Sequence, residues 1–275
     1  MNVAQIERLD PKTRAELTRA HELLNRAENF WNAYKTVKGG QARALRVGFG
    51  AYGVYPIDLG NPFDFARPES DLEHVGGVCY LVRFFNVFYP ELIPDEMLSD
   101  FLLWAEFHEV GEIESGDKQD DGTRDEEAKD REEMEFLKKI TEYFPTKTRK
   151  KVISLFEQFQ KKDTDFGKMA FFIDKLEAVL SGLIYESQGR PGSYNNKREK
   201  IKKPSFNDRL NMEITGSTSI PDMWGCNIVL RARKYHFKHL SAFIEIMQAG
   251  AVDVRGKEMD WIQKAMNCPF DPSYL

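Results

Sequence analysis

The chain has 275 residues and a formal net charge of −5 at pH 7, so no overall positive charge favours binding to nucleic acid or to an anionic membrane. Its three widely spaced cysteines form no CxxC pair, and no stretch approaches the roughly 18 apolar residues of a membrane span, so we expect a cytoplasmic protein without a thiolate zinc site. Apolar residues make up 41% of the sequence, with 20 phenylalanines, which predicts one domain over residues 1–275 with a sizeable core.

Helical periodicity, with apolar residues three or four positions apart, dominates the sequence. In chain order it predicts helices over residues 13–37, 71–88, 94–113, 126–143, 147–160, 166–185 and 226–249, with a short one near Asp260. The first has an apolar face that includes Leu17, Leu24 and Tyr34, and we expect it to end at Gly39-Gly40, because glycine often follows a helix. The pattern indicates an all-α helical bundle.

One segment breaks this helical pattern. Residues 47–68 are rich in glycine, proline and aromatic residues, so they cannot form a continuous helix, although residues 47–55 favour a short β-hairpin. An ordered loop of this length is usually functional. Shorter polar loops are predicted at residues 116–125 and, with a basic composition, at residues 188–204.

Side chains that can ligate a metal lie in three of the apolar helices. His108 and Glu109 follow the run Phe101–Phe107, His74 lies in the preceding predicted helix, and Asp174 lies in a later one. Imidazoles and carboxylates in apolar surroundings cost several kcal/mol to desolvate unless a partner compensates them. A divalent metal would do so, and mixed nitrogen and oxygen ligands suit Mn, Co, Ni, Fe or Zn, with Mg as a further candidate.

Each of these residues also has an ordinary structural interpretation. A single histidine such as His74 on an apolar helix is more often a hydrogen-bonded core residue than a ligand, and Asp174 could pair with the neighbouring Lys175. The acidic run over residues 120–135 is typical of a solvated helix face, because lysine and arginine alternate with the acids at helical spacing.

The ordered motifs resemble those of the HD-domain metal-dependent phosphohydrolases, above all the branch that contains the 5′-deoxynucleotidases. The resemblance spans about residues 66–186 and rests on three segments: Arg67-Pro-Glu-Ser-Asp-Leu-Glu-His74, His108-Glu109-Val-Gly-Glu112-Ile-Glu-Ser-Gly-Asp117 and Ile173-Asp174-Lys-Leu-Glu-Ala178. Two features depart from the branch. Glu109 stands where the family has aspartate, and the Arg-Trp pair that precedes the first histidine in the branch has no counterpart here.

The resemblance implies an HD-like core with the N-terminal and C-terminal helices packed on it. It implies one divalent metal held by His74, His108, Glu109 and Asp174. Glu112 would orient or deprotonate the attacking water, Asp117 would hydrogen-bond a sugar hydroxyl or the departing oxygen, and Arg67 would hold phosphate. The expected substrate is a nucleoside monophosphate or a similar phosphomonoester, without stable nucleic-acid binding. Because members of the family are commonly dimers, a homodimer is also expected.

Two other functions remain open from the sequence. Glu109 and the missing Arg-Trp pair would also fit a degenerate HD-type module that binds a nucleotide or partner without turnover. Some HD-domain proteins hold two irons and act as oxygenases, but they need further histidine ligands. The remaining histidines are His21, His236 and His239, and the last two stand three apart in the predicted helix 226–249.

Overall fold

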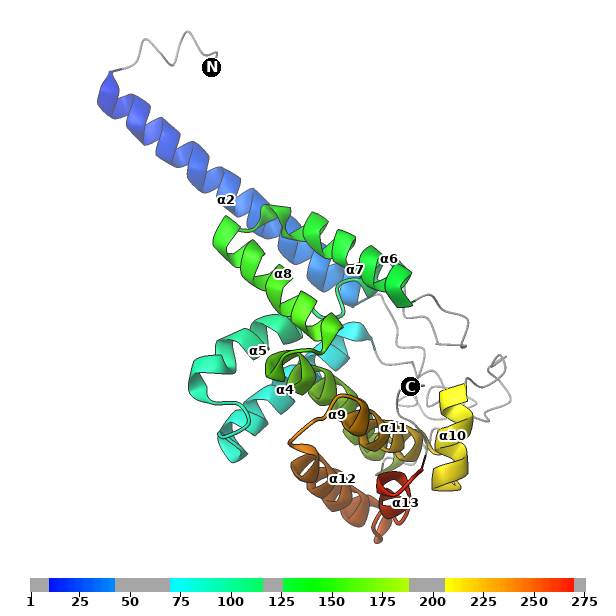
Figure 1. The fold of residues 1–275 in the computed structure, drawn as a ribbon. Coiled ribbons are helices and arrows are strands. Elements are labelled where there is room, and N and C mark those ends of the chain that lie inside the picture. The colour runs from blue at the N-terminus through cyan, green and yellow to red at the C-terminus, as the bar shows by residue number, and fades with distance from the viewer. Residues whose placement is uncertain (1–9, 43–69, 116–125, 188–205, 270–275) are drawn as a thin grey trace, which may run out of the picture.

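The computed structural model describes residues 10–42, 70–115, 126–187 and 206–269, which are helical and contain no strand (Figure 1). The helices are α2 (Pro11–Gln41), α4 (Asp71–Phe88), α5 (Asp95–Phe107), α6 (Glu112–Ser115), α7 (Glu126–Ile140), the 3₁₀ helix η1 (Thr141–Tyr143), α8 (Thr146–Lys161), α9 (Asp165–Ser187), α10 (Phe206–Thr215), α11 (Ile220–Lys234), α12 (Leu240–Arg255) and α13 (Ile262–Met266). The predicted all-α fold is confirmed. The predicted loops at residues 47–68, 116–125 and 188–204 lie outside the described residues.

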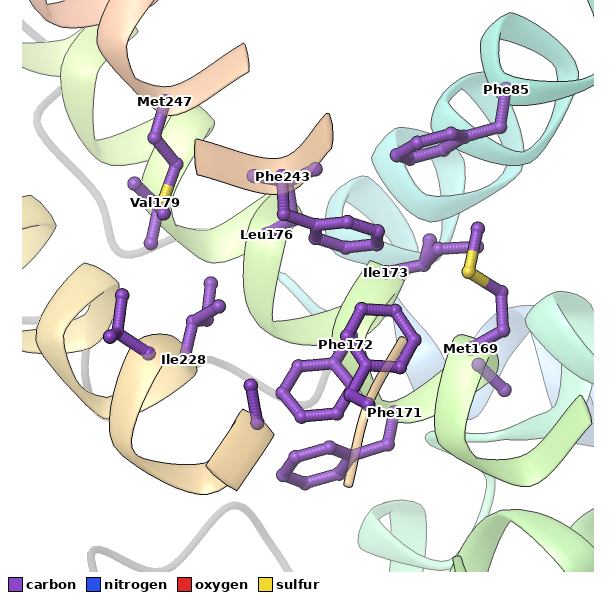
Figure 2. Close-up of a cluster of buried hydrophobic side chains, with 14 of the residues drawn as sticks. Phe85, Met169, Phe171, Phe172, Ile173, Leu176, Val179, Ile228, Phe243 and Met247 are labelled. Carbon is purple, nitrogen blue, oxygen red and sulfur yellow. The ribbon is translucent and has the colours of Figure 1, made fainter. Parts of the chain in front are cut away.

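Helix α9 forms the centre of the core because it is apolar on nearly every side. Helices α4, α8, α11 and α12 pack around it. Figure 2 shows side chains of α9 meeting those of its neighbours, among them Phe172, Leu176, Val179, Ile228, Phe243, Met247 and Phe85. None of the helices in the described part of the chain is long and apolar enough to cross a membrane.

The N-terminus of α4 is fixed by a capping box. The backbone N–H of Ser70 donates to Glu73 Oε2 at 2.8 Å, and the Ser70 hydroxyl accepts from the backbone N–H of Glu73 at 3.4 Å. These two bonds satisfy backbone donors that a helix start otherwise leaves unpaired. The first turn of α4 is thereby held in place, and His74 lies within it.

The predicted helix over residues 94–113 is interrupted. Helix α5 ends at Phe107, residues 108–111 form a turn, and α6 begins at Glu112. Backbone hydrogen bonds in the turn span three residues, from Val110 to Phe107 and from Glu112 to Glu109, which tightens the backbone relative to an α-helix. The prediction of one continuous helix was wrong, and His108 and Glu112 lie in different segments, in the turn and in α6.

The predicted helix 226–249 is also two helices. Helix α11 ends at Lys234 and α12 begins at Leu240, with His236 in a left-handed conformation at φ 51° between them. Phe237 explains the break, because its ring turns into the core and lies 4.2 Å from that of Phe172 between centroids. Helix α10 was not predicted.

The glycines near the end of α2 have a different role from the one expected. The helix continues to Gln41, so Gly40 lies inside it and is buried. A Cβ atom on Gly40 would lie 2.9 Å from Ile113 Cγ1, well inside contact distance. The glycine therefore lets α2 approach α6 closely, rather than ending the helix.

Candidate metal centre

Four buried side chains from three parts of the chain meet at one point. They are His74 of α4, His108 and Glu109 of the turn after α5, and Asp174 of α9, and we call them the four-residue group. One potential ligand atom from each lies within 4.8 Å of those from all the others. His74 Nε2 is 3.0 Å from Asp174 Oδ1, 3.2 Å from Glu109 Oε1 and 3.2 Å from His108 Nε2. The sequence predicted these four residues as ligands, and the structure brings them together.

The other nitrogen of each imidazole is occupied by an acceptor. His108 Nδ1 lies 2.8 Å from the carbonyl oxygen of Ala105, and His74 Nδ1 lies 2.5 Å from Glu177 Oε2. A carbonyl or carboxylate oxygen only accepts, so each Nδ1 carries the proton. Metal-binding histidines are commonly oriented in this way, with the second nitrogen bonded to a carboxylate or a backbone carbonyl.

This arrangement turns the two Nε2 atoms toward each other at 3.2 Å. Burial lowers the pKa of His108 below its ordinary value, and this effect exceeds the opposing effect of Glu109. A neutral His108 with its proton on Nδ1 presents a lone pair at Nε2, and so does His74 in the same tautomer. Two facing lone pairs beside two carboxylates repel one another unless a cation lies between them, so the four side chains fit a divalent metal.

The carboxylate of Asp174 uses both of its oxygens. Oδ1 faces His74, and Oδ2 lies 2.8 Å from Lys175 Nζ. Burial favours the neutral acid, but the ammonium of Lys175, with further contributions from the nearby imidazoles, outweighs it and holds the pKa of Asp174 well below its usual range. Asp174 therefore pairs with Lys175 through one oxygen, and its other oxygen faces the four-residue group.

Glu109 reaches the group although it is one methylene longer than the aspartate of the family pattern. Its Oε1 lies 3.2 Å from His74 Nε2 and 3.6 Å from His108 Nε2, and the residue is buried. The turn accommodates the longer side chain, and the carboxylate of Glu109 converges with the ligand atoms of His74, His108 and Asp174.

Glu177 is a part of the site that was not predicted from the sequence. Its Oε2 bonds His74, and its Oε1 accepts a hydrogen bond from the Ser181 hydroxyl at 2.6 Å. Gly77 of α4 makes the room, since a Cβ there would overlap Glu177 Oε1 and lie 2.9 Å from Cδ. The spacing in the sequence could have indicated this role, because Glu177 follows Asp174 by three residues and so lies on the same face of α9.

A second set of charged residues borders the site on α7. Lys129 Nζ lies 3.5 Å from Glu112 Oε1 and 3.1 Å from Glu133 Oε1, and both acids are buried. Burial raises the pKa of Glu133, and the charge of Glu109 adds to the increase. A Cβ on Gly111 would lie 2.9 Å from Glu133 Cα, so this glycine allows α7 to pack against the turn.

The part of the acidic run that the structure describes, residues 126–135, is therefore not only a solvated helix face, because Glu133 is 7% exposed and points into the protein. The alternation of acidic and basic residues in the sequence concealed this buried acid. Among the other predicted site residues, Glu112 lies at the start of α6 but is not in the four-residue group. Asp117 and Arg67 lie outside the described residues.

The other histidines lie elsewhere. His21 is exposed on α2, His236 lies in the turn after α11, and His239 is the N-cap of α12. His236 and His239 do not share a helix face, contrary to the expectation. The metal-ligating group found among the described residues contains two histidines, His74 and His108.

Comparison with protein families gives one match. A family model described as "HD domain" matches residues 62–214, which is more than half of the chain and includes the whole four-residue group. Searches of curated proteins and of solved structures found no significant match. Members of the HD domain family are typically metal-dependent phosphohydrolases. The extent of the match and the buried group of histidines and carboxylates within it lead to one conclusion: the chain belongs to the HD domain family.

Proposed function

We propose that the chain is a metal-dependent phosphomonoesterase that hydrolyses a nucleoside monophosphate or a similar phosphate ester. The observation that carries this proposal is the buried convergence of His74, His108, Glu109 and Asp174, with each imidazole oriented through its other nitrogen. The nucleotide substrate rests on the resemblance of three ordered motifs to the 5′-deoxynucleotidase branch, which includes the acids corresponding to Glu112 and Asp117.

In this proposal the four-residue group holds one divalent ion, with Mn, Co, Ni, Fe, Zn and Mg as candidates. When bound, the ion would polarise a phosphoryl oxygen and lower the pKa of water. Asp174 contributes a carboxylate that Lys175 keeps ionised, and Glu177 fixes the proton of His74 on Nδ1, so that Nε2 is left to bind.

Glu112 is the proposed general base. It is buried, it follows Glu109 by three residues, and the ammonium of Lys129 lies 3.5 Å from its Oε1. A nearby positive charge favours the ionised carboxylate, the form that accepts a proton from an attacking water molecule. Asp117 is assigned to a sugar hydroxyl or the departing oxygen, and Arg67 to the phosphate, both on the motif resemblance alone.

A test begins with protein purified without chelator, in which bound metal is measured by elemental analysis. Phosphate release is then assayed with nucleoside monophosphates and with non-nucleotide phosphomonoesters, each in the presence of Mn, Co, Ni, Zn or Mg. We expect about one ion per chain and metal-dependent release. Substrate preference within this panel tests the nucleotide assignment separately from the hydrolase assignment.

Two pairs of variants sharpen the test. Glu112→Gln should lower kcat by about 10²-fold or more while metal is retained, and Glu114→Gln, an exposed position on the same short helix, should not. Asp174→Asn should lose metal and turnover together, whereas Asp165→Asn, exposed at the start of α9, should lose neither.

Glu109 gives one specific reason to keep a second function, a module that binds phosphate esters without turnover. Metal binding and saturable nucleotide binding without phosphate release on any substrate in the panel would support that function and refute the hydrolase. If hydrolysis then appeared in Glu109→Asp, which restores the family's aspartate, Glu109 would be the cause of the missing turnover.

A further inference from the structure

The N-terminal half of α2 presents its surface to solvent. Every residue from 14 to 31 is exposed, and Figure 1 shows this half of the helix projecting away from the other helices. The C-terminal half is anchored, since Gly40 packs on Ile113 and Gln41 Nε2 donates to the carbonyl oxygen of Glu106 at 3.2 Å. A helix gains most of its stability in a protein from packing of an apolar face, so an exposed stretch of this length indicates that something covers it.

The exposed half has a continuous apolar face with a seven-residue repeat. Leu17, Leu24 and Trp31 follow one another at intervals of seven, and so do Ala20, Ala27 and Tyr34. Leu23 and Phe30 widen the same face. The six large apolar residues of this face are between 41% and 71% exposed: Leu17, Leu23, Leu24, Phe30, Trp31 and Tyr34. A repeat of seven with two apolar positions is the pattern by which two helices pack along their length.

The apolar face leads into a groove at the base of α2. The groove has a volume of about 1130 Å³ and lies between α2, the start of α4, the end of α5 and the residues around η1. Phe30, Tyr34 and Val37 line it from α2, opposite Leu72 and Val75 of α4. The exposed face and the groove therefore form one contiguous apolar surface rather than a set of isolated side chains. A contiguous surface of this kind indicates an interaction site.

We propose that this surface is the interface of a homodimer, in which α2 of one chain packs antiparallel on α2 of a second copy. With residue 24 opposite residue 27 of the partner, the large side chains of the two seven-residue repeats meet small or complementary ones. Leu24 then lies against alanine, Trp31 against the alanine at position 20, and Leu17 against the tyrosine at position 34. A parallel pairing in register would instead place Trp31 against Trp31 and alanine against alanine, alternating crowded layers with cavities.

The area available is that of a stable dimer. If a fully exposed large apolar residue presents about 200 Å², the six side chains expose roughly 650 Å² per chain. Two chains would bury roughly 1,300 Å², within the range of about 1,200–2,000 Å² for stable protein interfaces. The same antiparallel pairing brings the N-terminal turns of the partner helix beside residues 34–41, over the groove. The proposal does not depend on the hydrolase activity, because none of the four-residue group takes part.

Sedimentation equilibrium on the full chain, over about 0.1–100 μM, tests the proposal. We expect a dimer in the wild type and a monomer for Leu24→Asp. Because the interface contains the residue twice, and a central apolar anchor contributes a factor of about 30 or more, the dimer affinity should fall by about 1,000-fold. Asn25→Asp is the matched control, since it adds the same charge at an exposed neighbouring position away from the apolar face.

Disulfide trapping tests the direction of packing. Leu24→Cys and Ala27→Cys proteins, mixed and oxidised, should form the mixed disulfide, whereas a parallel dimer would link each variant to itself. Wild-type protein controls for Cys79 and Cys268. A monomeric wild type would overturn the proposal, and so would a dimer that persists in Leu24→Asp. Protection of residues 14–31 from amide exchange in a monomer would assign the surface to another part of the same chain.

Discussion

Gly77→Ala separates two effects of opposite sign on α4. Alanine is a better helix former than glycine by about 0.8–1 kcal/mol, so helix propensity alone predicts a more stable protein. At position 77, however, the new Cβ would overlap Glu177 Oε1 and lie 2.9 Å from Glu177 Cδ. Ordinary contacts are about 3.5–4.0 Å, so the carboxylate must move by roughly 1 Å.

That movement cannot occur without breaking hydrogen bonds. Glu177 is 4% exposed, bonds His74 Nδ1 through one oxygen and accepts from Ser181 through the other. Loss of a hydrogen bond to a charged group costs about 1.5–3 kcal/mol, which exceeds the gain in helix propensity. We therefore expect a net destabilisation of about 1–2 kcal/mol. Because partners of this kind orient metal-binding histidines, metal affinity should also fall by about 10–100-fold.

Gly76→Ala is the matched control. It is the same substitution one residue earlier in the same helix, but no described atom lies within 4 Å of the added Cβ. It should stabilise the protein by somewhat less than about 1 kcal/mol and leave metal affinity unchanged. Urea unfolding of chelated protein measures the first quantity, and competition with a chromophoric chelator measures the second. If Gly77→Ala matched Gly76→Ala in both, Glu177 would not orient His74 as the geometry indicates.

Two further predictions concern packing and pH. Gly167→Ala should destabilise the protein by about 2–3 kcal/mol, because the added Cβ would lie 2.7 Å from the backbone carbonyl carbon of Gln158. Urea unfolding measures this change, and a variant as stable as the wild type would contradict this packing. Burial lowers the pKa of His108 below its ordinary value of 6.5. As the pH falls, the unfolded chain therefore takes up a proton at this residue before the folded chain does. The metal-free protein should thus lose stability as the pH falls below about 6.5. His108→Gln should flatten this slope in the same unfolding experiment, and an unchanged slope would refute the assignment.

The sequence by itself determined the fold class and pointed to the four-residue group. Apolar residues at helical spacing predicted most of the helices, because burial of one face dominates the local sequence pattern. His74, His108, Glu109 and Asp174 were identifiable because polar side chains in apolar helices require compensation, and because their order matched a family pattern.

Only the tertiary structure decided how these residues are held. The break at His108 and the one at His236 interrupt stretches with continuous helical periodicity, and at the second the chain turns to pack Phe237 on Phe172. The bond between His74 and Glu177 joins residues 103 positions apart, and it exists because Gly77 leaves the space for it. The apolar face of α2 has the sequence pattern of a core face, but the structure leaves it exposed over residues 14–31, since periodicity identifies an apolar face and not what covers it. Contacts between distant segments depend on close packing in three dimensions, which local sequence patterns do not encode.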